Sequence, residues 1–305
     1  MATTMGKPAA SGRAGAAVWW QATRAFSFPA SIVPVLLGAA LAARGYGAAQ
    51  TNFDALAFAL TLVGALLAHA GGNVWNDYFD FRRGVDTRPE HGSGVLTRRL
   101  LTPVQMRNFG VALLAGAALC GVLIVARRPA ALSLVVPLAL VGAACAVLYA
   151  ATLKRFALGD LIIMTAFGFG LTLGAYGVQT PVASGGQIGR ILLLSLPLTL
   201  LVDAILHANN IRDADDDGAS GVLTLARALG PRGSAVLQAV LVFGPLVLVV
   251  AFAALRLIPP SALAVLLTTP LLIKGFRTGG VPFLAQAHLL FGLLYALGVV
   301  VLPRP

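Results

Sequence analysis

The segment "SLPLTLLVDAILHANNIRDADDDG", residues 195–218, runs from an apolar stretch directly into four aspartates, and this transition decides the fold class. The apolar half suits a helix inside a lipid bilayer, where about 20 mostly apolar residues span the hydrocarbon core. The acidic half suits the polar boundary where such a helix leaves the membrane. A chain with only 11% charged residues therefore gathers acids at the end of a membrane span.

Composition extends this interpretation to the whole chain. Of the 305 residues 58% are hydrophobic, and the mean hydropathy is +0.87. About a quarter of the residues in a soluble protein are charged, compared with 11% here. We therefore predict an integral membrane protein that is embedded in the lipid bilayer. The net charge of +11 does not indicate nucleic-acid binding, because Lys and Arg of membrane proteins collect in cytoplasmic loops. Cys120 and Cys145 lie in apolar runs without CxxC spacing, which argues against a disulfide framework or a zinc site.

The apolar stretches predict an all-α polytopic fold with about nine transmembrane helices. Their approximate limits are 27–43, 54–76, 104–126, 130–151, 158–179, 190–209, 233–256, 260–274 and 283–302. Residues 1–23, without a cleavable signal peptide, are expected to form a flexible cytoplasmic tail, and residues 24–305 a single transmembrane domain.

Loop charges predict the orientation of this bundle. With a cytoplasmic N terminus, 16 of the 22 Lys and Arg residues lie on the cytoplasmic side, which leaves six on the other. Basic residues near span ends accumulate on the cytoplasmic side. We therefore expect a multi-pass protein of the cell membrane whose N terminus and Asp-rich loops are cytoplasmic.

Eight of the eleven acidic residues fall within residues 77–90 and 213–217, each just after an even-numbered span. If each span continues as a helix, a spacing of i, i+3 or i+4, and i+7 puts polar side chains on one face. In "GGNVWNDYFDFRRGVDT", residues 71–87, these are Asn73, Asn76 or Asp77, and Asp80. In the second segment they are Asn209, Asp213, Asp216 and Asp217.

Two such stripes predict a site for Mg²⁺ and a diphosphate. Clustered carboxylates repel one another and are costly to bury unless cations compensate them. Mg²⁺ prefers one or two carboxylates together with water and substrate phosphate oxygens. We expect the two acidic faces to meet across a central cavity that opens to the cytoplasmic side.

Other interpretations of the second cluster are a solvated loop and a calcium loop. A single acidic run after a span is often only solvated, but two Asn-led clusters at one membrane face make this less convincing. Asp213, Asp215, Asp217 and Gly218 match the opening of an EF-hand loop. The twelfth position, which must be acidic, is Thr224, so the calcium loop is not supported.

At this point the sequence resembles a known family. The strings "NDYFDFRRGVD" at 76–86 and "NNIRDADDDGASGVLTLARALG" at 209–230 resemble the two Asp-rich motifs of the UbiA superfamily of intramembrane prenyltransferases. They are most similar to the branch that prenylates 1,4-dihydroxy-2-naphthoate in menaquinone biosynthesis. Further resemblance lies in "WWQATRAFSFPASIVPVLLGAAL" at 19–41, "SGVLTRRLLTP" at 93–103 and "LYAATLKRFALGD" at 148–160.

The resemblance implies roles for individual residues. Catalysis and Mg²⁺ binding are implied for Asn76, Asp80, Asp213 and Asp217, with Asp77 and Asp216 as supporting metal carboxylates. Substrate binding is implied for Arg24, Asp86, Tyr149, Lys154, Arg155, Asn209, Asn210 and Arg212. Aromatic faces for the allylic cation are expected from Phe79, Tyr149 and Tyr176.

The implied function is Mg²⁺-dependent transfer of a polyprenyl group from its diphosphate to an aromatic quinone precursor, 1,4-dihydroxy-2-naphthoate, in menaquinone biosynthesis. The alternative acceptors are 4-hydroxybenzoate, homogentisate or a compound that is not a quinone precursor. Gly84 stands where the 4-hydroxybenzoate branch has a third Asp, which favours the naphthoate branch. A membrane transporter is a distant alternative. The acids of transporters lie near the bilayer midplane, whereas most acids of this chain collect at one membrane face.

Two features fall outside the resemblance. Val222 follows Gly221 where the family often has Lys, so that Arg227 is a candidate replacement for the missing cation. Asp203 and His207 lie one helical turn apart within a span. Ionisable residues at membrane depth are candidates for function, here acceptor binding or proton handling, although a paired polar contact explains them equally well.

Overall fold

The computed structural model describes residues 15–47, 52–84, 92–151, 157–181, 184–219 and 221–302, and the side chains of 145–151 fall outside this description. Within these residues the protein is helical and contains no strand. The elements are α1 (Ala16–Ala22), η1 (Ala25–Ser27), α2 (Pro29–Ala43), α3 (Ala55–Arg82), α4 (Pro103–Arg127), η2 (Pro129–Ala131), α5 (Leu132–Ala151), α6 (Gly159–Ile163), η4 (Met164–Gly170), α7 (Leu171–Gln179), α8 (Gly185–Arg212), α9 (Ala214–Ala219), α10 (Leu225–Ala254), η5 (Pro260–Thr268), α11 (Thr269–Thr278) and α12 (Val281–Val301).

Seven helical segments in the described part of the chain are long and apolar enough to cross a membrane. They are Ala25–Ala43, Ala55–Arg82, Pro103–Arg127, Gly159–Gln179, Gly185–Arg212, Leu225–Ala254 and Val281–Val301. The predicted all-α membrane fold is thereby confirmed. The two remaining predicted stretches, 130–151 and 260–274, are also helical, as α5 and as η5 followed by α11. A count of nine membrane-crossing helices stays a prediction.

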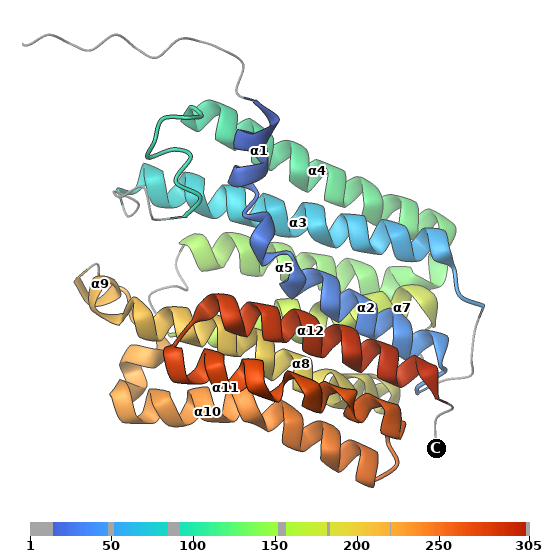
Figure 1. Ribbon diagram of the computed structural model, residues 1–305. Helices are drawn as coiled ribbons and strands as arrows, with labels where there is room; N and C mark the ends of the chain where they lie inside the picture. The colour runs from blue at the N-terminus through green and yellow to red at the C-terminus, as the bar shows by residue number, and fades with distance from the viewer. Residues whose placement is uncertain are drawn as a thin grey trace, which may run out of the picture.

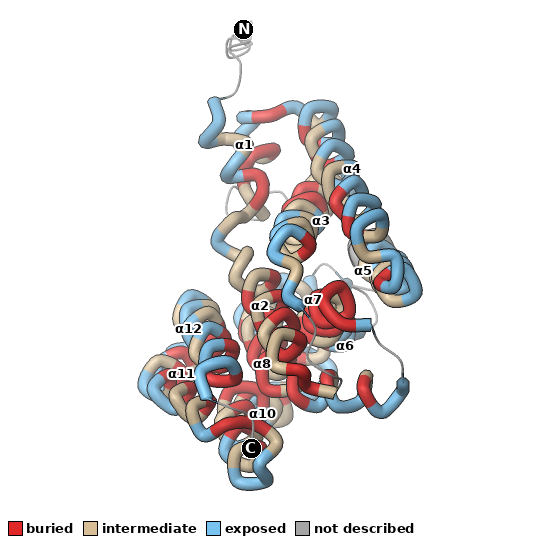
Figure 2. The backbone as a smooth tube through the Cα atoms, turned by 90° about the vertical axis from the view of Figure 1, so that its right-hand side faces the viewer, coloured by how far each residue is buried: buried red, intermediate tan, exposed pale blue. Residues whose placement is uncertain are grey.

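The long helices run side by side, and α8 occupies the interior of the bundle (Figure 1). Among the seven candidate spans α8 is the most buried and α4 the least. Figure 2 shows buried residues concentrated on α2, α7 and α8, whereas α4 exposes most of its surface. The main apolar core joins residues of α2, α8, α10 and α12, among them Leu37, Leu198, Phe291 and Tyr295. This core holds α8 in place, and α8 leads directly into the second acidic segment.

Helix α3 continues through the first acidic segment, as the spacing predicts. Asp54 caps its N terminus by accepting a hydrogen bond from the backbone N–H of Ala57. The helix runs without a break to Arg82, and Gly84 then turns the chain with a positive φ of 71°. A left-handed residue just beyond the last turn is a common way to end a helix, and Gly adopts it without strain.

Close helix packing depends on small residues at the contact between α12 and α2. A Cβ atom built on Gly292 of α12 would lie 1.7 Å from Cγ1 of Val33 on α2. Small residues allow membrane helices to approach closely and gain dispersion energy. Gly292 is therefore needed for the observed separation of these two helices.

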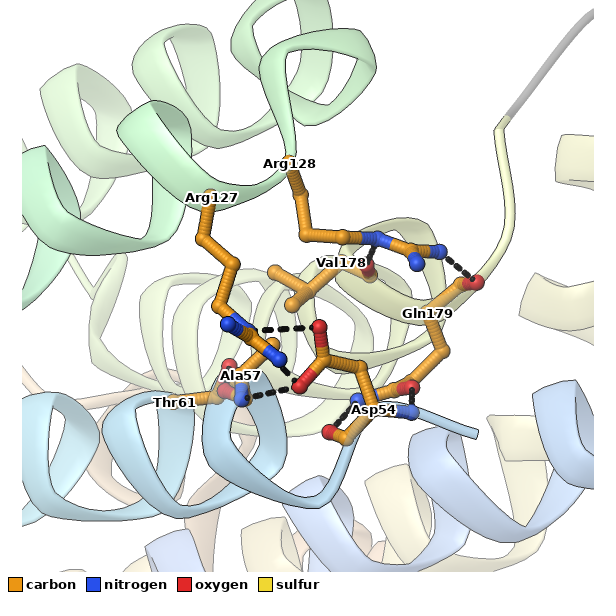
Figure 3. A network of polar contacts seen from close by, with 7 residues as sticks. All are labelled: Asp54, Ala57, Thr61, Arg127, Arg128, Val178 and Gln179. Atoms are coloured by element: carbon orange, nitrogen blue, oxygen red, sulfur yellow. Dashed lines mark hydrogen bonds and ion pairs between the residues drawn. The ribbon is translucent and has the colours of Figure 1, made fainter. Parts of the chain in front are cut away.

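The end of the bundle opposite the acidic segments is closed by the polar network drawn in Figure 3. Arg127, at the end of α4, donates from Nε to both Asp54 carboxylate oxygens at 2.9 and 2.7 Å. Gln179, at the end of α7, bonds both the N–H and the C=O of Asp54 through its amide. Arg128 donates to the carbonyls of Val178 and Gln179. The network ties α3, α4 and α7 together at one level.

Replacing Gly292 with Ala should lower the thermal stability of the detergent-solubilised protein, because the added Cβ forces α12 away from α2. Overpacking of this kind costs about 1–3 kcal/mol. The measurement is the midpoint of thermal unfolding. Gly142→Ala on α5 is the matched control, because a Cβ there meets nothing within 4 Å. Equal midpoints for the two variants would contradict the packing argument.

The pKa of the Asp54 carboxyl lies below its ordinary value, because the carboxylate accepts hydrogen bonds from the Ala57 N–H and from Arg127. Its stabilisation is present above the ordinary carboxyl pKa, about 4, and is lost as the pH falls through the lower folded-state value. Asp54→Asn keeps a helix cap but removes the charge. We expect this variant to unfold at a lower temperature than the wild type at pH 7 and the gap to close on acidification. A gap independent of pH would contradict the ion pair.

Candidate active site

Both acidic segments lie at the same end of the bundle. The C terminus of α3 carries the first, and the junction of α8 with the short helix α9 carries the second (Figure 1). The Asp54 network closes the other end of α3, roughly 40 Å away by the 1.5 Å rise per residue of a 28-residue helix. The predicted clustering of the acids at one face of the bundle is therefore observed.

The first segment forms two polar stripes rather than the single stripe that the spacing suggested. Asn73 and Asp77 are one turn apart and contact other segments of the chain. Asn76 and Asp80 form the neighbouring i, i+4 pair, and Asp80 is only 6% exposed. The carboxamide oxygen of Asn76 is buried and has no hydrogen-bond partner. The two pairs separate because residues four apart align on an α-helix, whereas residues one apart diverge by 100°.

Asp77 is the anchor of the first stripe. Its carboxylate is 3% exposed, with Oδ1 2.9 Å from the Arg24 Nη2 and Oδ2 accepting the Ser93 N–H at 2.8 Å. A Cβ atom on Gly92 would lie 2.6 Å from the same carboxylate. Three separate chain segments thus meet at one buried charge, and the glycine is required for their close approach.

The segment before α2 is held against α3 by further polar contacts. Arg24 adopts a left-handed conformation, φ 53°, and ends the turn between α1 and η1. Asn73 donates to the Thr23 carbonyl at 2.9 Å, and Gln21 donates to the Ser93 carbonyl at 2.7 Å. Trp19 packs edge-on against Phe109 of α4, with ring centroids 4.8 Å apart. Residues 16–22, assigned from the sequence to a flexible tail, therefore form helix α1, docked beside the first acidic segment.

The second segment is not one continuous helix, so the predicted single face over Asn209, Asp213, Asp216 and Asp217 is interrupted. Helix α8 ends at Arg212, Asp213 has φ −94° and ψ 9°, and α9 begins at Ala214. Hydrogen bonds with helical spacing persist across the junction, from Asp213 N–H to Asn209 O and from Asp217 N–H to Asp213 O. The kink changes the direction of the chain but keeps the acids within one turn of each other.

Helix α9 ends in a Schellman arrangement at Gly221. Gly221 has φ 69° and donates to the Gly218 carbonyl, and Val222 N–H donates to the Asp217 carbonyl at 2.8 Å. Val222 occupies the position after the left-handed residue, where an apolar side chain is usual, and it is 8% exposed. The sequence flagged this residue as a missing cation, and the structure shows why an apolar side chain fits.

Arg227 packs onto this corner from α10. Its guanidinium donates to the Val222 carbonyl, and a Cβ on Gly218 would lie 2.9 Å from its Nη2. One positive charge therefore lies against the backbone of the acidic loop, although Lys is absent at position 222. The loop also contacts the start of α6, because Ala157 N–H donates to Leu223 O at 2.8 Å. Asp86, Lys154 and Arg155 lie outside the described residues, as does the side chain of Tyr149.

The remaining predicted residues lie in several environments. Arg212 forms two hydrogen bonds with its neighbour Asp213, at 2.7 and 2.6 Å, and both side chains are exposed. Asn209 donates to the Ile205 carbonyl of its own helix. At the same corner Asn210 and Asp217 are partly exposed and Asp216 is exposed. Phe79 stacks on Trp75, with ring centroids 5.2 Å apart.

Tyr176 does not belong to this site. Its hydroxyl donates to the Tyr46 carbonyl, and α7 continues from there only to Gln179, which contacts Asp54 at the far end of the bundle. The expectation that Tyr176 faces an allylic cation is therefore wrong. Its apolar surroundings had suggested an interior position, but they did not reveal at which end of α7 it lies.

The donor set at the acidic end fits Mg²⁺. The buried Asn76 oxygen without a partner and the adjacent Asp80 carboxylate are hard oxygen ligands on one face of α3. The described residues bring no three His, Cys, Asp or Glu side chains together as a complete metal shell. Such a sparse set suits an ion whose other ligands are water and substrate phosphate oxygens.

Comparison with known proteins identifies the family. The family model described as "UbiA prenyltransferase family" matches residues 31–278. The chain belongs to the UbiA prenyltransferase family. It is therefore a prenyltransferase, as the two acidic motifs predicted. The family match covers most of the chain, because it extends from α2 to the end of α11.

Curated relatives of this UbiA-family protein are named UbiA prenyltransferase domain-containing protein 1. The human protein is 34% identical over 306 residues, covering 97% of this chain and 87% of the relative. The Xenopus tropicalis protein is 35% identical over 291 residues, covering 92% and 81%. These names confirm the family but do not specify the naphthoate branch.

Solved structures share the fold of this UbiA-family protein. An apo UbiA homologue from Aeropyrum pernix K1 aligns with a TM-score of 0.66 and 19% identity, over 90% of this chain and 96% of the other. A homologue from Archaeoglobus fulgidus bound to DMAPP and Mg²⁺ aligns with a TM-score of 0.59 and 13% identity, over 93% and 99%. At these identities the likeness establishes the helical architecture.

Replacing Asp77 with Asn should loosen the segment that follows Gly92, because Arg24 then lies partly buried without its counter-charge. Removing one partner of a buried ion pair costs about 3 kcal/mol. We expect faster trypsin cleavage at the exposed Arg98 and Arg99, measured by mass spectrometry in detergent.

Asp215→Asn is the matched control, since Asp215 is exposed on α9 at the same end of the bundle. Arg24→Gln should resemble Asp77→Asn, and the double variant should add little, because both changes break one pair. Wild-type cleavage rates in Asp77→Asn would show that this carboxylate does not anchor the segment.

Proposed function

We propose that this protein catalyses the Mg²⁺-dependent transfer of a polyprenyl group from its diphosphate to an aromatic quinone precursor, 1,4-dihydroxy-2-naphthoate, in menaquinone biosynthesis. The observation that carries the proposal is that two Asn/Asp helix ends lie at the same end of an apolar bundle. Family relatives bound to DMAPP or GPP with Mg²⁺ support the donor and the metal. The motif form N-D-Y-x-D followed by G-x-D supports the acceptor branch.

Four residues are proposed to hold the metal and to be catalytic. These are Asn76, Asp80, Asp213 and Asp217. Asn76 contributes a buried amide oxygen already without a partner, and Asp80 a nearly buried carboxylate one turn further along α3. Asp216 supports the site from α9, and Asn209 and Asn210 line it from the end of α8. When bound, Mg²⁺ would neutralise negative charge that develops on the departing diphosphate.

Asp77 and Arg24 are assigned to positioning rather than to direct metal or diphosphate binding. The two side chains form an ion pair at 2.9 Å, and the second oxygen of the Asp77 carboxylate accepts a hydrogen bond from the Ser93 N–H. Asp77 lies next to Asn76, so this anchor fixes the turn of α3 that presents Asn76 and Asp80. Its effect on catalysis is transmitted through the helix backbone.

Basic residues are proposed to complete the diphosphate site. Arg227 takes the place of the Lys that the family often has after the second motif, because its guanidinium already lies on the loop from Gly218 to Val222. Arg212 is held by Asp213 at the same corner. Lys154 and Arg155 precede Ala157, whose N–H bonds the Leu223 carbonyl. Asp86 and Tyr149 keep the substrate-binding roles that the resemblance implies.

The bundle interior is proposed to protect the reactive prenyl cation. The C–O bond to the diphosphate breaks with its electron pair going to the departing oxygen, and an electron-rich ring carbon of the acceptor forms the new C–C bond. That carbon then loses its proton to the diphosphate, which restores the aromatic ring. The apolar helices exclude water, which would otherwise capture the cation. Phe79 is a candidate aromatic face near the acidic end. We place the acidic end on the cytoplasmic side of the cell membrane, following the loop charges.

The acceptor preference is supported by the backbone at Gly84. This residue ends α3 with φ 71°, where a side chain is disfavoured. The 4-hydroxybenzoate branch has an acidic residue at this position. With glycine at position 84, this protein lacks a carboxylate that the 4-hydroxybenzoate branch has one turn beyond Asp80.

Purified protein in detergent, given a long-chain isoprenyl diphosphate, 1,4-dihydroxy-2-naphthoate and Mg²⁺, should release diphosphate and form a prenylated product detected by mass spectrometry. EDTA should abolish the reaction. Asp80→Ala or Asp213→Ala should reduce turnover by about 100-fold or more, because each removes a group that stabilises developing charge.

Asp215→Ala is the matched control and should retain turnover, since this residue is exposed on α9 and is not assigned to the metal. Parallel reactions contain 4-hydroxybenzoate or homogentisate in place of the naphthoate. Exclusive transfer to one of these acceptors would overturn the naphthoate assignment. Absence of product with every aromatic acceptor would overturn the proposed function itself.

A further inference from the structure

A second polar cluster lies inside the bundle, away from the diphosphate-binding groups. Its five side chains come from three helices and are 0–6% exposed. They are Asp160 of α6, Asp203 and His207 of α8, and Ser234 and Gln238 of α10. The catalytic roles proposed above use none of them.

Three members of this cluster form a continuous hydrogen-bonded chain. His207 Nδ1 lies 2.8 Å from Asp160 Oδ1, and His207 Nε2 lies 2.8 Å from Ser234 Oγ. The order of partners is satisfied by one tautomer, in which Nδ1–H donates to the carboxylate and Nε2 accepts from the hydroxyl. In the observed rotamer of His207, each ring nitrogen therefore has a hydrogen-bond partner of the right kind.

The cluster does not contribute to the fold in the way that apolar packing would. Asp160 Oδ2, Asp203 Oδ1 and Gln238 Oε1 are buried and make no hydrogen bond. Buried acceptors without donors cost stability, and replacing buried polar groups with apolar ones is often neutral or stabilising. Polar groups kept at such a cost in a membrane bundle are candidates for a role in function.

The position of these hydrogen-bonded side chains in the fold indicates what they do. His207 lies two residues before Asn209 and six before Asp213 on α8, so it fixes the last turns of the helix that carries the second motif. Helix α10 begins just after the Gly221 corner, is interrupted at Gly230, where φ is 68° and ψ is 174°, and carries Ser234 four residues after this break. Asp160 lies in the first turn of α6, three residues after Ala157, whose N–H bonds Leu223 of that corner. These hydrogen bonds thus join α8, which enters the acidic corner, to α6 beside it and to the part of α10 that follows Gly230.

We propose that Asp160, His207 and Ser234 are positioning residues that set the acidic corner of α8 and α9 for binding of the metal–diphosphate group. Gln238 supports the same register by donating to the Ala204 carbonyl of α8 at 3.1 Å. A histidine bonded at both nitrogens cannot tolerate rotation of α8 relative to α6 and α10. An apolar contact at the same place would allow α8 to rotate or slide, because dispersion contacts lack direction. This inference rests on the proposed diphosphate site.

The test compares the wild type with Asp160→Asn, Ser234→Ala and the double variant. We expect each single change to raise the KM for the polyprenyl diphosphate by about tenfold, as loss of supporting groups around metal ligands typically does. The KM for the aromatic acceptor should change little. The double variant should show much less than the product of the single effects, because both residues act through His207.

A second measurement does not require turnover. Inorganic pyrophosphate with Mg²⁺ should raise the thermal unfolding midpoint of the wild type, and the rise should be smaller in Asp160→Asn and in Ser234→Ala. Ser234→Thr keeps the hydroxyl and should restore the wild-type response. The matched control is Ser195→Ala, because Ser195 is buried on the same α8 and its hydroxyl donates to the Leu192 carbonyl of its own helix.

The outcomes separate the positioning role from the proposed function. Variants that unfold at lower temperature but keep the wild-type diphosphate KM and pyrophosphate response would overturn the inference and leave only a structural role. A wild type with no pyrophosphate response would overturn it as well. A normal pyrophosphate response without prenyl transfer to any acceptor would overturn the proposed function while the positioning role stands.

Discussion

The need of buried carboxylates for an ion-pair or hydrogen-bond partner is the constraint on which the acidic end of this bundle depends. An apolar helix bundle in a membrane offers neither water nor a high dielectric to a charged side chain, so each buried acid needs a specific partner. Asp77 has Arg24 and the Ser93 N–H, and Asp160 has His207. These pairings decide which chain segments meet there. The acids at the exposed junction of α8 and α9 stay near the polar boundary, where bound cations can compensate them.

This constraint divides the acidic residues of the protein into two groups. One group is satisfied within the chain and holds elements in register, as Asp77 does for the segment before α2 and Asp160 for α8 and α10. The other group, Asp80 on α3 and the acids of α9, lies at the shared end of the bundle, where Asn76 adds an oxygen without a hydrogen-bond partner. Neighbours in sequence thereby have different tasks. Asn76 and Asp77 lie 100° apart on the helix. The Asn76 oxygen has no hydrogen-bond partner, whereas the Asp77 carboxylate is paired with Arg24 and accepts the Ser93 N–H.

Much of this arrangement could be predicted from the sequence, because hydropathy fixes the membrane class and i, i+4 spacing fixes which side chains share a helix face. The helical first motif, the clustering of the acids and the family followed from these patterns. The docking of α1, the Ser93 and Gly92 contacts with Asp77, and the histidine chain could not be predicted, because each depends on long-range contacts between segments that no local period encodes. The kink at Asp213 was missed since helical spacing continues through it. Tyr176 was misplaced because periodicity does not state which end of a buried helix faces the site.

The Gly221 corner has a consequence for how this family diversifies. The hydrogen bonds of residue 222 at this corner are made by its backbone, through its N–H to Asp217 and its carbonyl to Arg227, and Gly221 is left-handed. The path of the chain and the source of the positive charge therefore depend on different residues. Gly221 sets the path of the chain, and a cation can come from position 222 or from Arg227 on α10. In the proposed diphosphate site the positive charge can therefore come from either residue without a change in the loop backbone. The fold sets where this charge lies in space, and the sequence position that supplies it can differ.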